Sequence, residues 1–276
     1  MRTIKYCKMN FLEFNSKSRN FLLMILLLIV LRRKVMPYTA IAIALNRPIN
    51  AWGRLALLFS DPKFNLRIGI GLIFLLCDVP NTSGYQKMVV LRTGKKWWAR
   101  NQQIFILFII IVYYILIVAS ALILCLKYCE YGLEWGKTLI TVARMTSISE
   151  MMHVDIPSVL ITNCNKSILC FLYTFVLHIG ASIIIIGILE LLCLHLNRSV
   201  GIMVASIIII EDISIGLFFS PKLFRYSIWS MTRVTLLFQG KACNEINLLY
   251  ACIVVIIGIV ISQKLCYASL KYKEIL

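Results

Sequence analysis

Charged residues are scarce in this sequence of 276 residues, and acidic residues are the scarcest. Asp, Glu, Lys and Arg make up 15% of the chain, only 12 residues are acidic, and 60% of the residues are hydrophobic. A soluble domain needs about a quarter of its residues charged and about half apolar, because water must wet its surface. The composition therefore excludes a soluble globular enzyme, and the high hydrophobicity excludes a disordered tail.

Alternation of apolar and polar residues is missing as well. A transmembrane β-barrel needs stretches of about ten alternating residues, whereas the apolar run from Ile104 to Leu126 carries no charge and does not alternate. An α-helix satisfies its own backbone hydrogen bonds within each span, as hydrocarbon requires. We therefore expect an all-α fold, with one polytopic transmembrane helical bundle over residues 1–276.

Motifs for catalysis and metal binding are also missing. The sequence has no C-x-x-C, no H-E-x-x-H and no G-x-S-x-G, so we expect no catalytic residue and no metal site. The run from Gly132 to Thr138 ends in Gly-Lys-Thr, but it has three residues between its glycines, and a phosphate-binding loop has four. We expect the chain to bind no ATP. Whether two of Cys129, Cys164 and Cys243 form a disulfide stays an open question.

Long apolar runs predict about six spans. The clearest has 23 residues, Ile104 to Leu126, which as a helix would be about 35 Å long, enough to cross a bilayer. A count of five or seven spans stays open. The second span reaches back to Leu55 only if residues 60–63 lie at a membrane surface. The six predicted spans are residues 20–38, 68–76, 104–126, 167–189, 200–219 and 246–261.

The first apolar run has two interpretations. Arg32, Arg33 and Lys34 cut it after 11 residues, Phe21 to Leu31, which is about half a bilayer. A retained span whose basic side chains reach one interface is favoured over a signal peptide, because no small-x-small cleavage site follows.

The net charge is +17, and the basic residues lie in the connectors between apolar runs. They would meet anionic lipid headgroups there. Nucleic-acid binding is not indicated, because the sequence has no soluble domain with a basic surface. Lys and Arg are nearly equal in number on the two sides of a six-span chain, so they do not set its orientation. The basic cluster around Trp97 and Trp98 indicates a cytoplasmic position, because tryptophan favours the interface.

Two groups of residues are candidates for function. The first group is a docking surface for a cytoplasmic protein or, alternatively, a segment lying on lipid: Arg92, Lys95, Lys96, Trp97, Trp98 and Arg100. The second is Glu211 and Asp212, in the middle of a predicted span. A carboxylate in hydrocarbon is costly, so the pair either lines a translocation path, or engages a cation, or marks a break in the helix. We expect His178 to be a neutral side chain bonded to a neighbouring helix, and Glu190 to be interfacial.

Several short motifs share a layout with a known family. An amphipathic N-terminal stretch precedes the first span, Cys77-Asp78-Val79-Pro80 ends the second, and a segment closing in Arg92-Thr-Gly-Lys-Lys-Trp97-Trp98 precedes the third. Phe218-Phe219-Ser220-Pro221 follows the fifth. In this layout the chain resembles the permease subunits of bacterial ABC exporters, the six-helix type-2 class that includes bacteriocin and peptide exporters.

The resemblance implies a function and a set of partners. Residues 1–19 would form a cytoplasmic amphipathic elbow helix, residues 78–103 a cytoplasmic coupling loop, and residues 127–166 and 220–245 extracellular connectors. A separate ATPase subunit, carrying ATP and Mg, would dock on the elbow and the coupling loop. A second permease, identical or a sister subunit, would complete a path for a hydrophobic or amphipathic peptide, lined by the first, second and fifth spans. The chain would be a non-catalytic, multi-pass protein of the bacterial cell membrane, in contact with lipid and not with nucleic acid. The rival is a membrane scaffold or immunity protein that transports nothing.

Overall fold

The protein is almost entirely helical in the residues that its structure, a computed structural model, describes: 2–15, 17–80, 84–145, 156–164, 166–238 and 247–272. One two-stranded sheet, β1 with β2, is the exception within these ranges. The all-α expectation is therefore confirmed. The elements in chain order are α1 (Arg2–Asn15), α2 (Ser18–Ala44), β1 (Ile49–Asn50), α3 (Ala51–Ser60), α4 (Pro62–Leu76), α5 (Gly84–Thr93), α6 (Lys95–Ile123), η1 (Leu126–Tyr128), β2 (Cys129–Glu130), α7 (Gly136–Arg144), α9 (Ser158–Asn163), α10 (Ser167–His195), α11 (Arg198–Phe218), η2 (Pro221–Tyr226), η3 (Ser230–Thr232), α12 (Val234–Leu237) and α13 (Leu248–Tyr272).

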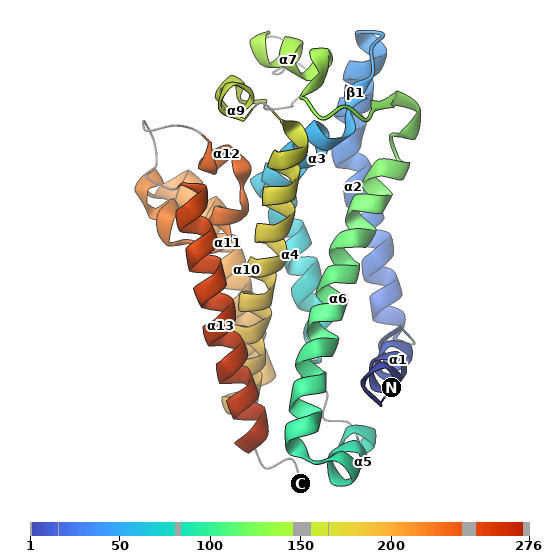
Figure 1. Cartoon of the computed structure of the whole chain (residues 1–276), viewed down its shortest axis with the longest axis vertical. Helices are drawn as coiled ribbons and strands as arrows, with labels where there is room; N and C mark the ends of the chain where they lie inside the picture. The colour runs from blue at the N-terminus through green and yellow to red at the C-terminus, as the bar shows by residue number, and fades with distance from the viewer. Residues whose placement is uncertain are drawn as a thin grey trace.

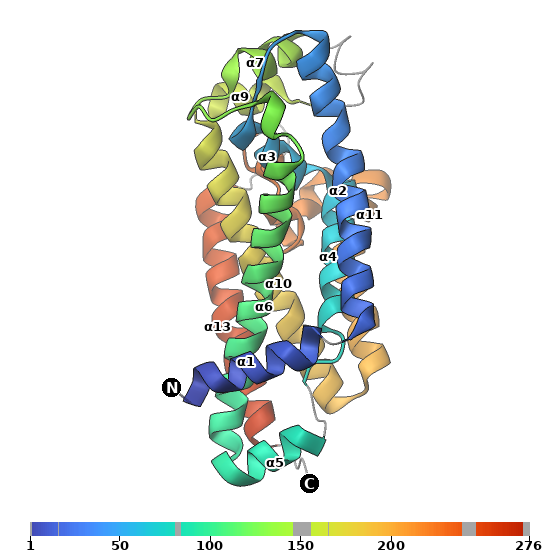
Figure 2. The same cartoon turned by 90° about the vertical axis from the view of Figure 1, so that its right-hand side faces the viewer.

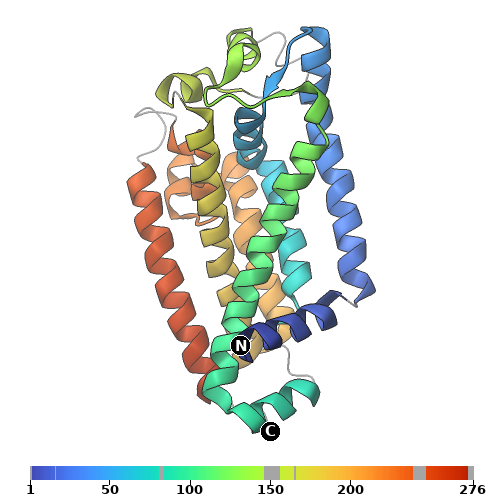
Figure 3. The same ribbon diagram turned by 45° about the vertical axis from the view of Figure 1, so that its right-hand side comes forward.

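The long helices lie side by side along the longest axis of the molecule (Figure 1). These helices are α2, α4, α6, α10, α11 and α13. Helix α5 lies at one end, near both termini, and we call this the α5 end; α7 and α9 lie at the opposite, or α7, end (Figure 1). Helix α1 does not follow the bundle axis but crosses the bundle near the α5 end (Figures 2 and 3).

Within the residues that the structure describes, four helices are long and apolar enough to cross a membrane: α6, α10, α11 and α13. Large apolar side chains on them point outward, including Ile115, Leu217 and Ile256, which are 52%, 70% and 60% exposed. Such exposure is unfavourable in water and costs nothing in hydrocarbon. The chain is therefore a helical membrane protein. The four helices coincide with predicted spans, but α6 begins at Lys95 rather than Ile104 and α13 continues to Tyr272 rather than Ile261.

Helix α2 is longer than the first predicted span. It runs from Ser18 to Ala44, so Arg32, Arg33 and Lys34 lie within the helix rather than at its end. Lys34 forms an ion pair with Asp61, the residue that precedes α4. The charge of Lys34 is thus neutralised by another residue of the chain. The prediction placed this side chain at the membrane interface and did not include an ion pair.

The second predicted span, residues 68–76, lies within α4, and its possible extension back to Leu55 falls on a separate helix, α3, with Asp61 between the two helices. The Asp61 carboxylate accepts hydrogen bonds from the backbone N–H groups of Lys63 and Phe64, at 2.8 and 3.3 Å. This is an N-cap, and Pro62 fits the first helical position because no N–H is needed there. Helix α3 is almost wholly buried. A single span reaching from Leu76 back to Leu55 does not form.

Helix α10 is the centre of the bundle and packs against α3, α6, α11 and α13. Its approach to α13 depends on small residues. A Cβ added at Gly258 of α13 would lie 2.6 Å from Cδ1 of Ile184, and one added at Gly187 would lie 3.1 Å from Cβ of Ser262. Close approach through small residues is the usual way that helices pack in membranes, because apolar lipid leaves packing as the main attraction.

The side chain of Asn50 joins three elements at the α7 end. Its Oδ1 accepts hydrogen bonds from the backbone N–H of Gly53 at 2.8 Å and from the hydroxyl of Ser167 at 3.1 Å, while its Nδ2 donates to the carbonyl of Gly132 at 2.7 Å. The starts of α3 and α10 and the segment after β2 are thereby fixed relative to one another.

Candidate functional site

The segment predicted as a coupling loop, residues 78–103, is mainly helical. Helix α5 spans Gly84–Thr93, and α6 begins at Lys95. Gly94 alone separates the two helices, with a φ of 84° that glycine adopts without strain. Trp97 and Trp98 therefore lie in the first turns of a bundle helix rather than in a loop, and the prediction is corrected on this point.

A network of buried polar side chains joins α1, α5 and α6. The amide oxygen Oε1 of Gln86 on α5 accepts a hydrogen bond from the indole of Trp98 at 2.9 Å and lies 3.0 Å from the hydroxyl of Tyr6. Gln86 Nε2 donates to Oδ1 of Asn10 at 2.6 Å, and the hydroxyl of Tyr6 also lies 3.2 Å from Oε1 of Gln102. All five side chains are buried. Because paired buried polar groups are costly to separate, α5 is tied to both α1 and α6.

The predicted docking residues divide into an exposed and a buried set. Arg92, Lys96 and Arg100 are exposed, and Lys95 is half-buried. Trp98 is fully buried, so its role is structural and the expectation that it meets a partner is corrected.

Trp97 also belongs to the packing of α1. It is half-buried, and its ring packs edge-on against Tyr6 with the centroids 5.4 Å apart. The exposed surface at the start of α6 is therefore basic rather than aromatic.

Asp78 is the meeting point of three basic side chains from different parts of the chain. Lys17 and Arg19 each lie 2.8 Å from its Oδ2, and Arg198 lies 3.0 Å from its Oδ1. Partial burial by itself would raise the pKa of this carboxyl, but the hydrogen bonds and charges of Arg19 and Lys17 outweigh it and lower the pKa to about 2. The junction ties the C-terminal end of α4 to the starts of α2 and α11.

Glu211 and Asp212 lie in the middle of α11, which runs through both without a break. The alternative of a broken helix is therefore wrong. Asp212 is 1% exposed and accepts hydrogen bonds from the hydroxyl of Ser230 at 2.7 Å and from Arg233 at 3.1 Å. Asp212 therefore engages a cation of its own chain. Glu211 is half-buried.

His178 is fully buried at the centre of the bundle. Its Nδ1 lies 2.8 Å from the carbonyl of Thr174, and its Nε2 lies 3.1 Å from the hydroxyl of Thr232. The rings of Phe59 and Trp229 pack against it with centroids 5.3 and 5.6 Å away. Both ring nitrogens thus have partners within the chain, as expected of a side chain that packs rather than ligates.

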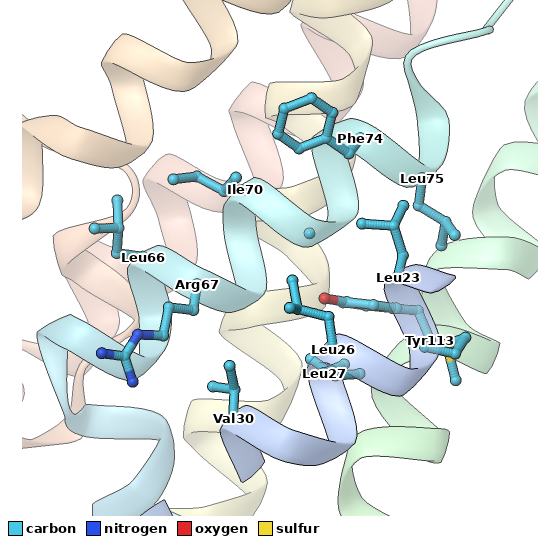
Figure 4. A pocket seen from close by; sticks show the side chains of 12 residues that line it. Leu23, Leu26, Leu27, Val30, Leu66, Arg67, Ile70, Phe74, Leu75 and Tyr113 are labelled. Carbon is cyan, nitrogen blue, oxygen red and sulfur yellow. The ribbon is translucent and has the colours of Figure 1, made fainter. Parts of the chain in front are cut away.

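An apolar cavity of about 360 Å³ lies between α2 and α4. Leu23, Leu27 and Val30 of α2 face Ile70 and Phe74 of α4 across it (Figure 4). Tyr113 of α6 reaches the cavity, and its hydroxyl donates to the backbone carbonyl of Ile68 at 2.9 Å. Arg67 of α4 also lines the cavity (Figure 4), and the other lining side chains are apolar, so the cavity presents mainly hydrocarbon to an occupant.

The Gly-Lys-Thr run lies at the start of α7, and its threonine serves the fold. Gly136 opens the helix with a φ of 75°, and the hydroxyl of Thr138 donates to the backbone carbonyl of Pro48 at 2.7 Å. That hydroxyl helps to hold α7 against the segment before β1.

The open question of a disulfide is answered in part. Cys129 and Cys164 are free thiols in this structure, and Cys243 lies outside the described residues.

Sequence reasoning did not identify Gln86, Arg198 or Arg233, although each makes contacts that organise these sites. The signal available was weak: Gln86 is a polar residue within a short run that also contains Met88 and Val90. Its partners come from residues far away in the chain, so only the folded arrangement shows what it does.

No family model, no curated protein and no solved structure matches this chain.

Proposed function

We propose that this chain is the membrane-spanning permease subunit of an ATP-driven ABC exporter. The observation that supports this best is the α5 end: the crossing helix α1 and the short helix α5 are joined through Gln86, beside a basic surface of Arg92, Lys96 and Arg100. A crossing helix next to a short helix between two spans is what the resembled family uses to receive force from a separate ATPase.

In this proposal six helices cross the membrane: α2, α4, α6, α10, α11 and α13. Helix α1 is the elbow helix at the cytoplasmic interface, and α5 is the coupling helix. The α5 end then faces the cytoplasm of a bacterial cell and the α7 end faces outward. This assignment places both termini inside, as an even number of spans requires.

The energy comes from a partner. The ATPase subunit binds ATP and Mg and hydrolyses the nucleotide, and the present chain converts its movement into a change of helix packing. Arg92, Lys95, Lys96 and Arg100 would meet acidic side chains of the ATPase, because opposite charges steer and orient such contacts.

The cargo is a hydrophobic or amphipathic peptide that leaves the cell. The apolar cavity between α2 and α4 supports this choice (Figure 4), since its lining from Leu23 to Phe74 suits aliphatic and aromatic side chains. A second permease, identical or a sister subunit, would cover the open side of the cavity. Glu211, next to Asp212 on α11, is proposed to line the same path.

The proposal is tested by co-purification with the ATPase encoded beside this chain. The wild-type chain should retain that ATPase through detergent extraction, and the double variant Arg92→Glu, Lys96→Glu should lose it by at least tenfold, because attraction becomes repulsion. Lys137→Glu with Lys222→Glu is the matched control, since both lysines are exposed and α7 and η2 lie away from the α5 end.

Two results would contradict the proposal. Retention that survives the double reversal would show that the basic surface is not the docking site. An absence of any ATPase gene nearby, together with a chain that purifies alone, would favour the membrane scaffold or immunity protein.

A further inference from the structure

A second cavity lies between α6, α10 and α13, separate from the apolar cavity of α2 and α4. Its volume is about 300 Å³, and most of its wall is isoleucine and leucine. Its polar side chains are Arg100 and Gln103 of α6, Glu190 of α10 and Gln263 of α13. A mostly apolar cavity with a few convergent polar groups is the usual form of a small-molecule site.

Glu190 is the group that gives this cavity a chemical preference. The side chain is 1% exposed, because it is enclosed by helices of its own chain; its interfacial position along the membrane normal stays a prediction. Its Oε1 is buried and has no hydrogen-bond partner in the part of the chain that the structure describes. A buried carboxyl oxygen without a partner is unfavourable, and an N–H donor arriving in the cavity would relieve that cost.

The charged neighbour of Glu190 does not satisfy it. Arg100 lines the same cavity, but no ion pair between the two residues is present in the described structure, and Arg100 is exposed near the start of α6. Water or lipid headgroups screen the guanidinium there, whereas Glu190 is shielded by apolar walls. The thiol of Cys266 on α13 interacts with the Glu190 carboxyl, but Oε1 stays unpaired, and no basic side chain among the described residues forms an ion pair with it.

The two amide side chains add acceptors to the same wall. Nε2 of Gln103 donates to the backbone carbonyl of Gln263 at 2.9 Å, which holds α6 and α13 together at the cavity and commits the donor of Gln103. Both glutamines are among the residues that line the cavity, and an amide oxygen can accept hydrogen bonds. A primary ammonium has three N–H donors to share among one carboxylate and such oxygens.

We propose that this cavity binds a small primary amine in its ammonium form, with an apolar body against the isoleucine wall and the ammonium on Glu190. The site is separate from the proposed cargo cavity and shares Arg100 with the proposed docking surface.

The test is calorimetric titration of the purified full chain in detergent with phenethylammonium. We expect saturable binding of one equivalent. Phenethyl alcohol, which has the same ring without the charge, should bind at least tenfold more weakly, because hydrogen bonds to a charged group are the stronger ones. Phenylpropionate, its anionic counterpart, should not bind measurably.

Variants distinguish the effect of the Glu190 charge on binding from an effect on folding. Glu190→Gln keeps the size of the side chain and should weaken phenethylammonium binding at least tenfold, while Glu190→Asp should retain part of it. Glu134→Gln, an exposed carboxyl on the connector before α7, is the control and should bind as the wild type does. Equal binding by Glu190→Gln, or equal binding of alcohol and ammonium, would overturn the proposal. Neither result bears on whether the chain binds an ATPase.

Discussion

Single polar side chains, each buried in an apolar surrounding, hold the α5 end together. Gln86 is the clearest example, because one amide serves partners on both α1 and α6. Burial of such a polar group is favourable only while each of its hydrogen-bond partners is present. The loss of Gln86 would leave its partners on α1 and α6 without the hydrogen bonds that it makes. The stability of this end therefore depends on very few residues.

Replacement of Gln86 by Leu tests this dependence. The change keeps the volume but removes the acceptor of the Trp98 indole and the donor to Asn10. We expect a loss of about 1–3 kcal/mol in stability, the cost of leaving buried polar groups unpaired, seen as a lower unfolding midpoint in detergent. Thr93→Ala is the control on the same helix, since Thr93 is exposed and its hydroxyl donates to the backbone carbonyl of Val89, within α5 itself. An unchanged midpoint for Gln86→Leu would contradict the role of the network.

Asp78 predicts a dependence on pH. Its pKa is about 2 in the folded chain, against an ordinary value of 3.8. A carboxyl whose pKa is lowered by folding stabilises the fold at pH values above the unfolded pKa, and this stabilisation is lost as the pH falls through the folded pKa. The contribution should be complete above about pH 4 and disappear toward pH 2.

The variant Asp78→Asn isolates this contribution. At pH 7 it should unfold at a lower temperature than the wild type, since Lys17, Arg19 and Arg198 lose their common partner. The difference between the two proteins should shrink as the pH falls from about 4 to about 2. The measurement is the unfolding midpoint over that range, with Glu134→Gln as the reference. A difference that stays constant with pH would refute the assignment.

At the scale of elements, helix packing in this chain combines apolar surface with small residues. Where α10 meets α13, the side chain of Ile184 fills the space beside Gly258, and a Cβ at that position would lie 2.6 Å from its Cδ1. The attraction between helices in lipid comes mainly from such packing, because lipid is as apolar as the helices themselves.

Gly258→Leu should therefore separate α13 from α10. A side chain there would meet Ile184 at 2.6 Å, and overpacking of this kind costs about 1–3 kcal/mol. The matched control is Gly216→Leu on α11, where the nearest atom is Phe224 Cζ at 3.7 Å. Thermal unfolding of both variants in detergent checks the prediction, which fails if the two variants are equally stable.

The elements also show what a sequence can and cannot predict. Helices α6, α10 and α11 are predictable because long uncharged or nearly uncharged runs admit one solution in lipid. Helix α2 is not, because the position of Lys34 within it depends on Asp61, the residue that precedes α4. The break between α3 and α4 has a local cause in Asp61 and Pro62, an N-cap pattern that the length of the apolar run concealed.

The candidate sites follow the same division. The basic character of the segment from Arg92 to Arg100 is visible in the sequence, and its exposure is confirmed for Arg92, Lys96 and Arg100. The burial of Trp98 and Glu190 could not be predicted, since it depends on helices far away in the chain. The amphipathic side chain of tryptophan fits both a membrane interface and a buried hydrogen-bond network. The sequence alone does not show which hydrogen-bond partner it has.

At the scale of the whole molecule, the bundle places α1 and α5 at one end and α7 and α9 at the other (Figure 1). The numbers of Lys and Arg do not decide which end faces the cytoplasm. The proposed function does decide it, because a cytoplasmic ATPase must reach the α5 end.

Epitope tags test this orientation in intact cells. A tag inserted after Glu134, on the connector before α7, should bind an impermeant antibody, whereas a tag fused before α1 should bind only after the membrane is opened. The reverse pattern would remove the basis for ATPase docking at the α5 end. The control for membrane insertion is that each tagged chain stays in the membrane fraction until detergent is added.

The single-residue joint at Gly94 has a mechanical consequence. The hydrogen bond between Gln86 and Trp98 holds α5 against the first turns of α6. A rotation of α5 would therefore rotate α6 with it. Helix α6 is one unbroken rod of 29 residues, about 43 Å long, and a swing of about 5° at its base carries its tip about 4 Å sideways. That tip adjoins η1 and β2, the strand that pairs with β1, so leverage applied at one surface of the bilayer would be felt as displacement at the other.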